Sequence, residues 1–161
     1  MQMAARKLRY DWFLKIINLY KYDYLIIGHH LDDSIETLFI NLFRGSGIYG
    51  LKGINKLLIF KKKKILRPFI NFKIKKKQIL NYANKNKIKW INDVSNLKNI
   101  YFRNKIRNKI IPFLEQNIFN FKKKIIKTLN NINLEYNFIK EIITYYTKKI
   151  FVLINIFIMK L

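Results

Sequence analysis

Residues 24–36 read Tyr24-Leu25-Ile26-Ile27-Gly28-His29-His30-Leu31-Asp32-Asp33-Ser34-Ile35-Glu36. The range opens with a short apolar run, long enough for one buried strand. It then holds both histidines of the chain and three of its nine acidic residues. Apolar residues spaced like one face of a helix follow: Ile35, Leu38, Phe39, Leu42 and Phe43. The polar cluster therefore falls between the end of a strand and the start of a helix, where ligands bind in open α/β sheets.

The composition excludes several classes of protein. The 161 residues suit one domain, and half of them are apolar, which is ample for a core. The chain has no cysteine, so disulfides, thiolate metal sites, iron–sulfur clusters and cysteine nucleophiles are excluded. We find no signal peptide near residue 1, and the apolar run at 150–159 is half the length of a membrane helix. We expect a cytoplasmic protein without a membrane partner.

The charge of the chain is strongly positive. Lysine and arginine number 33 against 9 acidic residues, which gives a formal net charge of +24. Such an excess predicts a polyanionic partner, either nucleic acid or anionic lipid. An AT-rich coding sequence would also enrich the chain in lysine, asparagine and isoleucine. The sign of the charge is therefore informative, and its magnitude is not.

Strands and helices are expected to alternate in the first part of the chain. The pattern predicts a strand at 23–28, helices at 4–21, 32–44, 74–86 and 100–114, loops at 45–53 and 90–96, a hairpin tip or solvated loop at 61–64, and one long helix or a helical pair from 119 onward. This order indicates an α/β fold with an α-helical C-terminal tail. We expect a parallel sheet with the strand at 24–28 in its interior.

The acid–histidine cluster has two local interpretations besides a ligand site. Asp33 and Glu36 have the N-cap and N3 spacing of a capping box, and Asp32 and Glu36 could also be exposed helix acids. Carboxylates at a helix N-terminus could instead hold Mg²⁺ bound to a nucleotide, because Mg²⁺ prefers a few carboxylates together with phosphate oxygens. The His-x-x-x-His spacing of zinc sites is absent.

A glycine-rich stretch follows the second predicted helix. Residues 45–50 match Gly-x-Gly-x-x-Gly, the fingerprint of dinucleotide-binding folds. The stretch follows a helix rather than a strand, and no acid occurs between Glu36 and Asp93 to bind a ribose. We therefore expect a loop beside the site, in which Gly45 and Gly47 expose backbone to a ligand.

Two further groups could contact nucleic acid. Arg103 and Arg107 lie four residues apart on one predicted helical face, which suits either phosphate contacts or a solvated face. Trp90 and Tyr101 could stack on a base, although core packing is the more common fate of such residues.

Taken together, these segments resemble the tRNA(Ile)-lysidine synthetases of the N-type ATP pyrophosphatase superfamily. The resemblance covers residues 4–114, and six pieces occur in order with the family's spacing. The pieces are Ala5-Arg6-x-x-Arg9-Tyr10, His29-His30-Leu31-Asp32-Asp33-Ser34-Ile35-Glu36-Thr37, Arg44-Gly45-Ser46-Gly47-x-x-Gly50-Leu51-x-Gly53, Leu66-Arg67-Pro68, Trp90-x-x-Asp93-x-Ser95-Asn96 and Arg103-Asn104-x-x-Arg107-x-x-x-x-Pro112.

The resemblance implies an adenine-nucleotide α-hydrolase-like sheet and a C–N ligase. In such an enzyme ATP adenylates the C2 oxygen of the wobble cytidine in an isoleucine tRNA, and L-lysine then displaces AMP through its ε-amine. Asp33 would be the carboxylate that handles cytidine and Mg²⁺, supported by Asp32. Arg9 would supply a fixed cation toward the base or the leaving AMP.

The remaining site residues implied by the resemblance bind the two larger substrates. His29, His30, Gly45 and Gly47 would lie around ATP. Arg44, Arg103 and Arg107 would hold tRNA phosphates, as part of the basic surface.

One family feature is missing. The pyrophosphatase loop, Ser-Gly-Gly-x-Asp-Ser, does not occur in these residues. We therefore expect an N-terminally truncated form, with a partial catalytic domain at 1–114 and a helical linker or tail at 115–161. By itself it should not turn over ATP. A catalytically inactive basic RNA-binding remnant is the alternative, whereas a tRNA thiolase of the same superfamily would need the cysteines that this chain lacks.

Overall fold

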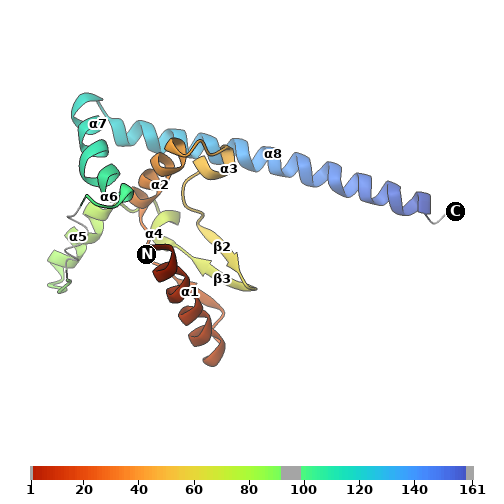
Figure 1. Ribbon diagram of the computed structural model, residues 1–161, viewed down its shortest axis with the longest axis horizontal. Helices are drawn as coiled ribbons and strands as arrows, with labels where there is room; N and C mark the ends of the chain where they lie inside the picture. The colour runs from red at the N-terminus through yellow and green to blue at the C-terminus, as the bar shows by residue number, and fades with distance from the viewer. Residues whose placement is uncertain (1, 92–98, 159–161) are drawn as a thin grey trace. The chain divides into compact units, whose positions relative to one another are not determined.

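The computed structural model describes residues 2–91 and 99–158 (Figure 1). The predicted segment around Asp93, Ser95 and Asn96 lies outside the described residues. The chain divides into two compact units, one formed by Met1–Ser34 and Ile54–Asn92 and the other by Ile35–Gly53 and Asp93–Leu161. We describe each unit by itself.

The first unit is built around a three-stranded sheet. Its elements are α1 (Gln2–Leu19), β1 (Tyr24–Ile26), β2 (Leu57–Phe60), β3 (Lys63–Leu66), α4 (Pro68–Asn71) and α5 (Lys76–Lys85). The strand order is β1-β3-β2, with β1 parallel and β2 antiparallel to β3. Ile65 is the partner of Leu25 on one side and of Leu58 on the other. Strands and helices are thus mixed as expected of an α/β fold.

Strands β2 and β3 form a hairpin whose turn consists of lysines. Lys61 and Lys62 have φ angles of 46° and 67°, the left-handed values of a type I′ turn. Lysine is a poor residue for such a backbone, but both side chains stay in solvent. The hairpin interpretation is confirmed for Lys61 and Lys62, whereas Lys63 and Lys64 already belong to β3. The hairpin explains why the sheet is mixed rather than wholly parallel.

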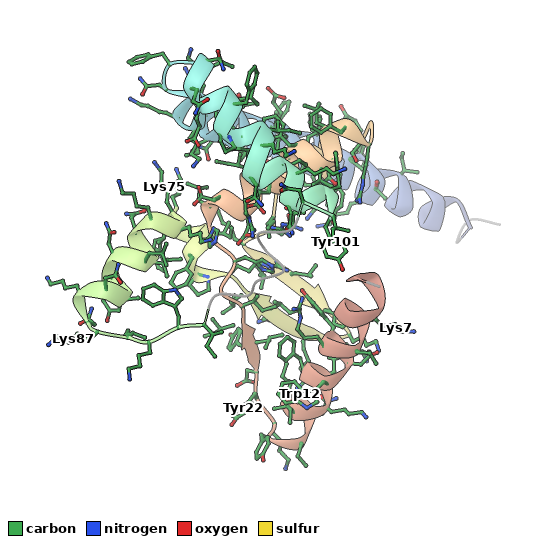
Figure 2. All side chains as sticks on the ribbon, turned by 60° about the vertical axis from the view of Figure 1, so that its left-hand side comes forward. Lys7, Trp12, Tyr22, Lys75, Lys87 and Tyr101 are labelled. Atoms are coloured by element: carbon green, nitrogen blue, oxygen red, sulfur yellow. The ribbon has the colours of Figure 1, made fainter. Side chains whose placement is uncertain are left out.

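Helix α1 covers this sheet through a small apolar core. Ile17 and Ile65 are buried, and the rings of Tyr10 and Phe60 meet edge to face with 5.5 Å between their centroids. Trp12 and Tyr22 lie more than half exposed in this unit (Figure 2). The predicted helix at 4–21 is confirmed.

The first strand corrects one expectation. In the described part of the chain β1 pairs with β3 alone, and Tyr24 and Ile26 are exposed. The strand is therefore an edge of the described sheet and not an interior strand. An apolar run reports a tendency to form a strand, but it does not report how many neighbours the strand has.

The second unit is helical. To it belong Ile35–Phe43 of α2 (Leu31–Phe43), α3 (Ile48–Leu51), α6 (Phe102–Lys105), the π-helical segment η2 (Ile106–Ile110), α7 (Ile111–Asn117) and α8 (Phe121–Ile158). Its core joins these helices through Ile35, Leu38, Phe39, Ile106, Ile111, Phe121 and Leu129. The rings of Phe39 and Phe121 are 6.0 Å apart, so α2 packs on α8.

The helix predicted at 100–114 contains a π-helical turn. In η2 the backbone N–H of Ile111 donates to the carbonyl of Ile106, five residues back. Pro112 has no N–H, and its ring would clash with the carbonyl of residue 108 in a regular α-helix. The wider turn relieves that clash, so helical structure continues to Asn117.

Two further expectations are settled by this unit. The chain from residue 121 forms one long helix, α8, and not a helical pair (Figure 1). The stretch predicted as a loop at 45–53 includes the short helix α3.

Over the described residues, the structure offers no helix with the length and apolar character of a membrane span. The division at residues 114 and 115 stays a prediction.

Candidate functional site

The start of α2 places Asp33 in a helix cap. Because α2 begins at Leu31, His30 is the N-cap residue and Asp33 occupies N3. Oδ2 of Asp33 accepts a 2.9 Å hydrogen bond from the backbone N–H of His30. This is one half of a capping box. The capping interpretation is thus correct for Asp33 but wrong in register, since Glu36 takes no part in the cap.

Asp32 holds a second helix. Its Oδ2 accepts a 2.8 Å bond from the backbone N–H of Lys76, the first residue of α5. That N–H has no partner within its own helix, and a carboxylate there also complements the positive end of the helix. Lys75 and Lys87, at opposite ends of α5, extend away from the ribbon (Figure 2).

The side chain of His30 lies against both carboxylates. Its Nδ1 is 3.5 Å from Oδ2 of Asp33 and 3.7 Å from Oδ2 of Asp32. Within the described residues this buried nitrogen has no hydrogen-bond partner. The three side chains form a compact group, which we call the Asp-His cluster: His30, Asp32 and Asp33. It offers negative charge and one ring nitrogen to a ligand.

Arg67 is a buried cation in the same unit. It is only 4% exposed, its Nε donates to Nδ1 of His29 at 3.2 Å, and its Nη1 donates to the carbonyl of Asn55 at 2.7 Å. Both acceptors are uncharged, and Arg67 has no ion pair in the described part of the chain. A buried charge without a counterion is costly, so the guanidinium suits an anionic ligand. Sequence reasoning did not single out Arg67, although Leu66-Arg67-Pro68 belongs to the resemblance.

Glu36 anchors the two predicted phosphate-binding arginines. Nε of Arg103 is 2.7 Å from its Oε2, while Arg107 donates from Nε to Oε1 at 2.6 Å and from Nη2 to Oε2 at 2.9 Å. Glu36 is 2% exposed, and about a third of each arginine side chain is exposed. The solvated-face interpretation is therefore wrong, because the pair is fixed by a buried carboxylate.

Comparison with known proteins identifies the family to which this chain belongs. Residues 1–114 match the family model of the PP-loop domain. The chain belongs to the PP-loop domain family.

Similar proteins include three that carry the name tRNA(Ile)-lysidine synthase. The protein of Bacillus subtilis is 34% identical over 141 residues, which are 88% of this chain and 29% of that protein. The protein of Francisella philomiragia is 44% identical over 112 residues (70% and 28%), and that of Buchnera aphidicola 42% over 123 residues (76% and 28%). This chain thus spans less than a third of the length of these relatives.

The PP-loop domain distributes the predicted site residues over its two units. In the first unit Asp32, Asp33 and His30 are in contact, and His29 meets Arg67. Arg9 is exposed on α1, and within the described residues no hydrogen bond or ion pair joins it to the two carboxylates. In the second unit Arg103 and Arg107 converge on Glu36.

Two glycines of the PP-loop domain lie at helix ends, one after α2 and one before α3. Gly45 has a φ of +67° and ends α2, with its N–H on the carbonyl of Leu42 and that of Ser46 on the carbonyl of Asn41. These are the two bonds of a Schellman motif. Gly47 is the N-cap of α3, and Arg44 beside them is exposed. Their role toward ATP or tRNA stays a prediction.

The ammonium group of Lys52, in the second unit, lies between two aromatic rings. Its Nζ lies 4.3 Å from the ring centroid of Tyr49 and 3.8 Å from that of Tyr136. Burial, followed by the positive charge of Lys140, lowers the pKa of Lys52 below its usual value of 10.5. The two ring faces act in the opposite sense, since they favour the cation.

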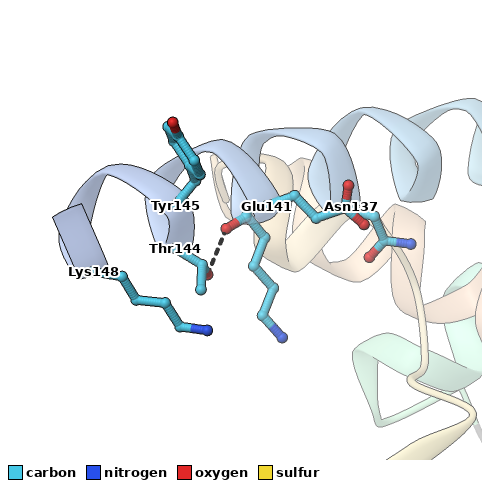
Figure 3. Close-up of a pocket in the computed structure, with 6 residues that line it drawn as sticks. Asn137, Glu141, Thr144, Tyr145 and Lys148 are labelled. Atoms are coloured by element: carbon cyan, nitrogen blue, oxygen red, sulfur yellow. Dashed lines mark hydrogen bonds between the residues drawn. The ribbon is translucent and has the colours of Figure 1, made fainter.

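Two other features offer less chemistry. A surface hollow on α8 is lined by Asn137, Lys140, Glu141, Thr144, Tyr145 and Lys148 (Figure 3). All six come from one helix, so no second element encloses it. Trp90, expected in the core, is 46% exposed.

The metal-binding capacity of the Asp-His cluster is limited. In residues 2–91 and 99–158 no three histidine, aspartate or glutamate side chains gather to hold an ion by themselves. Mg²⁺ keeps several waters and commonly takes only one or two carboxylates, with phosphate oxygens completing its shell. The two carboxylates of the cluster therefore suit Mg²⁺ that a nucleotide brings with it.

Proposed function

We propose that this chain is part of a tRNA(Ile)-lysidine synthase. It would supply the Asp-His cluster to a reaction that joins L-lysine to C2 of the wobble cytidine of an isoleucine tRNA. The observation that carries the proposal is the compact group of His30, Asp32 and Asp33 at the start of α2, in a domain of the PP-loop family. The similarity to proteins of that name supports the choice of substrate.

The reaction has two steps. The C2 oxygen of cytidine attacks the α-phosphorus of ATP and pyrophosphate leaves. The ε-amine of lysine then attacks C2, and the C2–O bond breaks to release AMP. The amine must lose its protons, and carboxylates at the site can stabilise the ammonium and accept a proton. We assign this work to Asp33, with Asp32 and His30 in support.

Cations on the same unit would meet the phosphate. Arg67 is buried with uncharged acceptors only, so a phosphate oxygen would supply the missing counterion. Arg9 would reach the base or AMP from the exposed side of α1. Asp33 would hold Mg²⁺ that arrives with the nucleotide, and the ion would supply positive charge to the phosphates.

The tRNA would be held by the basic surface. Arg44 is exposed, and Arg103 and Arg107 keep part of their guanidinium surface accessible while Glu36 fixes their positions. Such pre-positioned arginines lose less side-chain entropy on binding phosphate. We assign His29, Gly45 and Gly47 to the neighbourhood of ATP. Such an enzyme works in the cytoplasm, where its tRNA is.

The test is incorporation of radiolabelled lysine into an isoleucine tRNA in the presence of ATP. The protein assayed is this chain extended at its N-terminus by a Ser-Gly-Gly-x-Asp-Ser phosphate-loop segment of the family. We expect Asp33→Asn to abolish incorporation and to leave tRNA binding within a few-fold, because asparagine keeps a capping oxygen but loses the charge. The matched control is Asp11→Asn, a partly exposed acid of α1 paired with Lys61.

Two outcomes would count against the proposal. Activity of Asp33→Asn equal to that of the parent would leave Asp33 with its capping role alone. Salt-dependent tRNA binding without incorporation by the extended protein would indicate an RNA-binding protein without catalysis.

A further inference from the structure

The outer half of α8 presents an uncovered apolar face. Near the start of the helix, Ile125, Leu129 and Ile132 pack against the core of the second unit. Further along, eight apolar side chains are between 40% and 68% exposed: Leu134, Phe138, Ile139, Ile142, Ile143, Tyr145, Tyr146 and Ile150. An exposed patch of this size on one element marks an interaction surface.

These side chains occupy one side of the helix. At ~100° per residue they fall within about half of its circumference. The opposite side carries Asn137, Thr144 and Lys148, and Tyr145 lies at the border between the two sides (Figure 3). The outer half of α8 is thus amphipathic, and its apolar side does not pack against the core of the second unit.

Two charged residues interrupt the apolar side, and their placement is symmetrical. Glu135 and Lys149 are both exposed. Ile142 lies seven residues from each, so the three share one line along the helix. A helix running antiparallel to α8 and centred on Ile142 would place an acid opposite a lysine at both ends. Two copies of α8 paired in this way would therefore be electrostatically complementary to each other.

We propose that this face binds a second copy of the chain, with the two α8 helices antiparallel and Ile142 at the two-fold axis. Glu135 of one copy then faces Lys149 of the other, twice. Such self-complementary contacts are what a two-fold dimer requires. Parallel pairing would place Glu135 against Glu135 and Lys149 against Lys149.

The size of the face sets the expected strength. From Leu134 to Ile150 the seam is about 25 Å long at ~1.5 Å per residue. A single helix pair of that length buries less than the roughly 1,200 Å² of the smaller stable interfaces. We therefore expect a reversible dimer that dissociates on dilution in the micromolar range.

The test is sedimentation velocity of the full chain over a concentration series. We expect a monomer–dimer equilibrium in the parent. Glu135→Lys and Lys149→Glu should each weaken the dimer by about tenfold, because two symmetry-related contacts become repulsive. The double variant Glu135→Lys/Lys149→Glu should restore the parent affinity. The matched control is Lys148→Glu, the same reversal one residue away on the polar side, which should leave the dimer unchanged. Circular dichroism checks that each variant keeps its helix content.

Three results would overturn the proposal. A parent that remains monomeric at high concentration would mean that some other partner covers the face. Dimerisation that neither single reversal weakens would indicate parallel pairing or a different surface. If the double variant did not recover the parent's dimer affinity, Glu135 and Lys149 could not be in contact across the dimer.

Discussion

Nε of Arg107 lies 2.6 Å from Oε1 of Glu36, although 71 residues separate the two in the chain. The contact joins the π-helical segment η2 to α2 within the second unit. Arg103 completes the group from α6 at 2.7 Å. Since Glu36 is 2% exposed, its charge has lost most of its water, and the two guanidinium groups replace that solvation. The helical turn that carries the predicted phosphate contacts is therefore fixed from inside.

Removing this carboxylate should destabilise the second unit. We expect Glu36→Gln to lower the free energy of unfolding by roughly 3–5 kcal/mol, because two partly buried cations lose their anion. The measurement is urea unfolding followed by circular dichroism. Glu115→Gln, which breaks a more exposed pair with Lys122, should cost at most about 1 kcal/mol. Equal losses in the two variants would mean that burial adds nothing to the Glu36 contacts.

An anion should stabilise the parent through Arg67. Pyrophosphate that binds only the folded state stabilises it by RT ln(1 + L/Kd), where L is the free pyrophosphate concentration, so the unfolding temperature rises with that concentration. We expect a clear rise in the parent and a smaller one in Arg67→Met, whose side chain fills the space without charge. Lys15→Met removes one exposed cation of α1 and serves as the matched control for non-specific attraction to the net charge. The same rise in Arg67→Met as in the control would exclude Arg67 as an anion ligand.

Asp32 should control the first turn of α5. Its bond to the Lys76 N–H is a capping contact, and loss of such a contact costs about 0.5–2 kcal/mol. We expect Asp32→Ala to speed hydrogen exchange of the Lys76 amide, measured by NMR, with little change at amides of β3. Asp11→Ala should leave the Lys76 amide unaffected. An unchanged Lys76 amide in Asp32→Ala would mean that the contact does not persist in solution.

The pKa of Lys52 should respond to Lys140. Burial comes first among the causes that lower it, and the charge of Lys140 comes second. Lys140→Met should therefore raise the pKa of Lys52 part of the way to 10.5, as followed by a side-chain NMR titration. Lys148→Met is the control, and it should leave that pKa where it is.

The lowered pKa of Lys52 also makes the stability of the fold depend on pH. The unfolded chain binds the Lys52 proton more tightly than the folded chain, so the contribution of Lys52 to stability improves as pH rises from the folded pKa toward 10.5. Below the folded pKa both states are protonated and the penalty is complete. Lys140→Met should raise the folded-state pKa of Lys52, so the pH range over which stability rises should begin at a higher pH.

Local patterns in the sequence predicted the strand–helix junction well. The apolar run at 24–28 and the helical spacing after Ile35 placed β1 and α2 within a few residues, because both signals are periodic and short-range. The capping-box interpretation, with Asp33 as the N-cap residue, implied a helix that begins at Ser34. Because α2 begins three residues earlier, at Leu31, Asp33 occupies N3 instead. No local pattern could reveal that Glu36 pairs with Arg103 and Arg107, or that Asp32 reaches Lys76. Those contacts depend on tertiary packing.

The bond from Arg67 to His29 decides which tautomer of the imidazole exists. Because Nε of Arg67 donates to Nδ1 of His29, that ring nitrogen must present a lone pair, and the hydrogen of the neutral ring must sit on Nε2. His29 can then offer a proton donor to an oxygen of a substrate, but it has no lone pair left with which to take a proton from an amine. Within this pair His29 is a hydrogen-bond donor held in place, so in the proposed reaction the role of base falls to Asp33, with Asp32 and His30 in support.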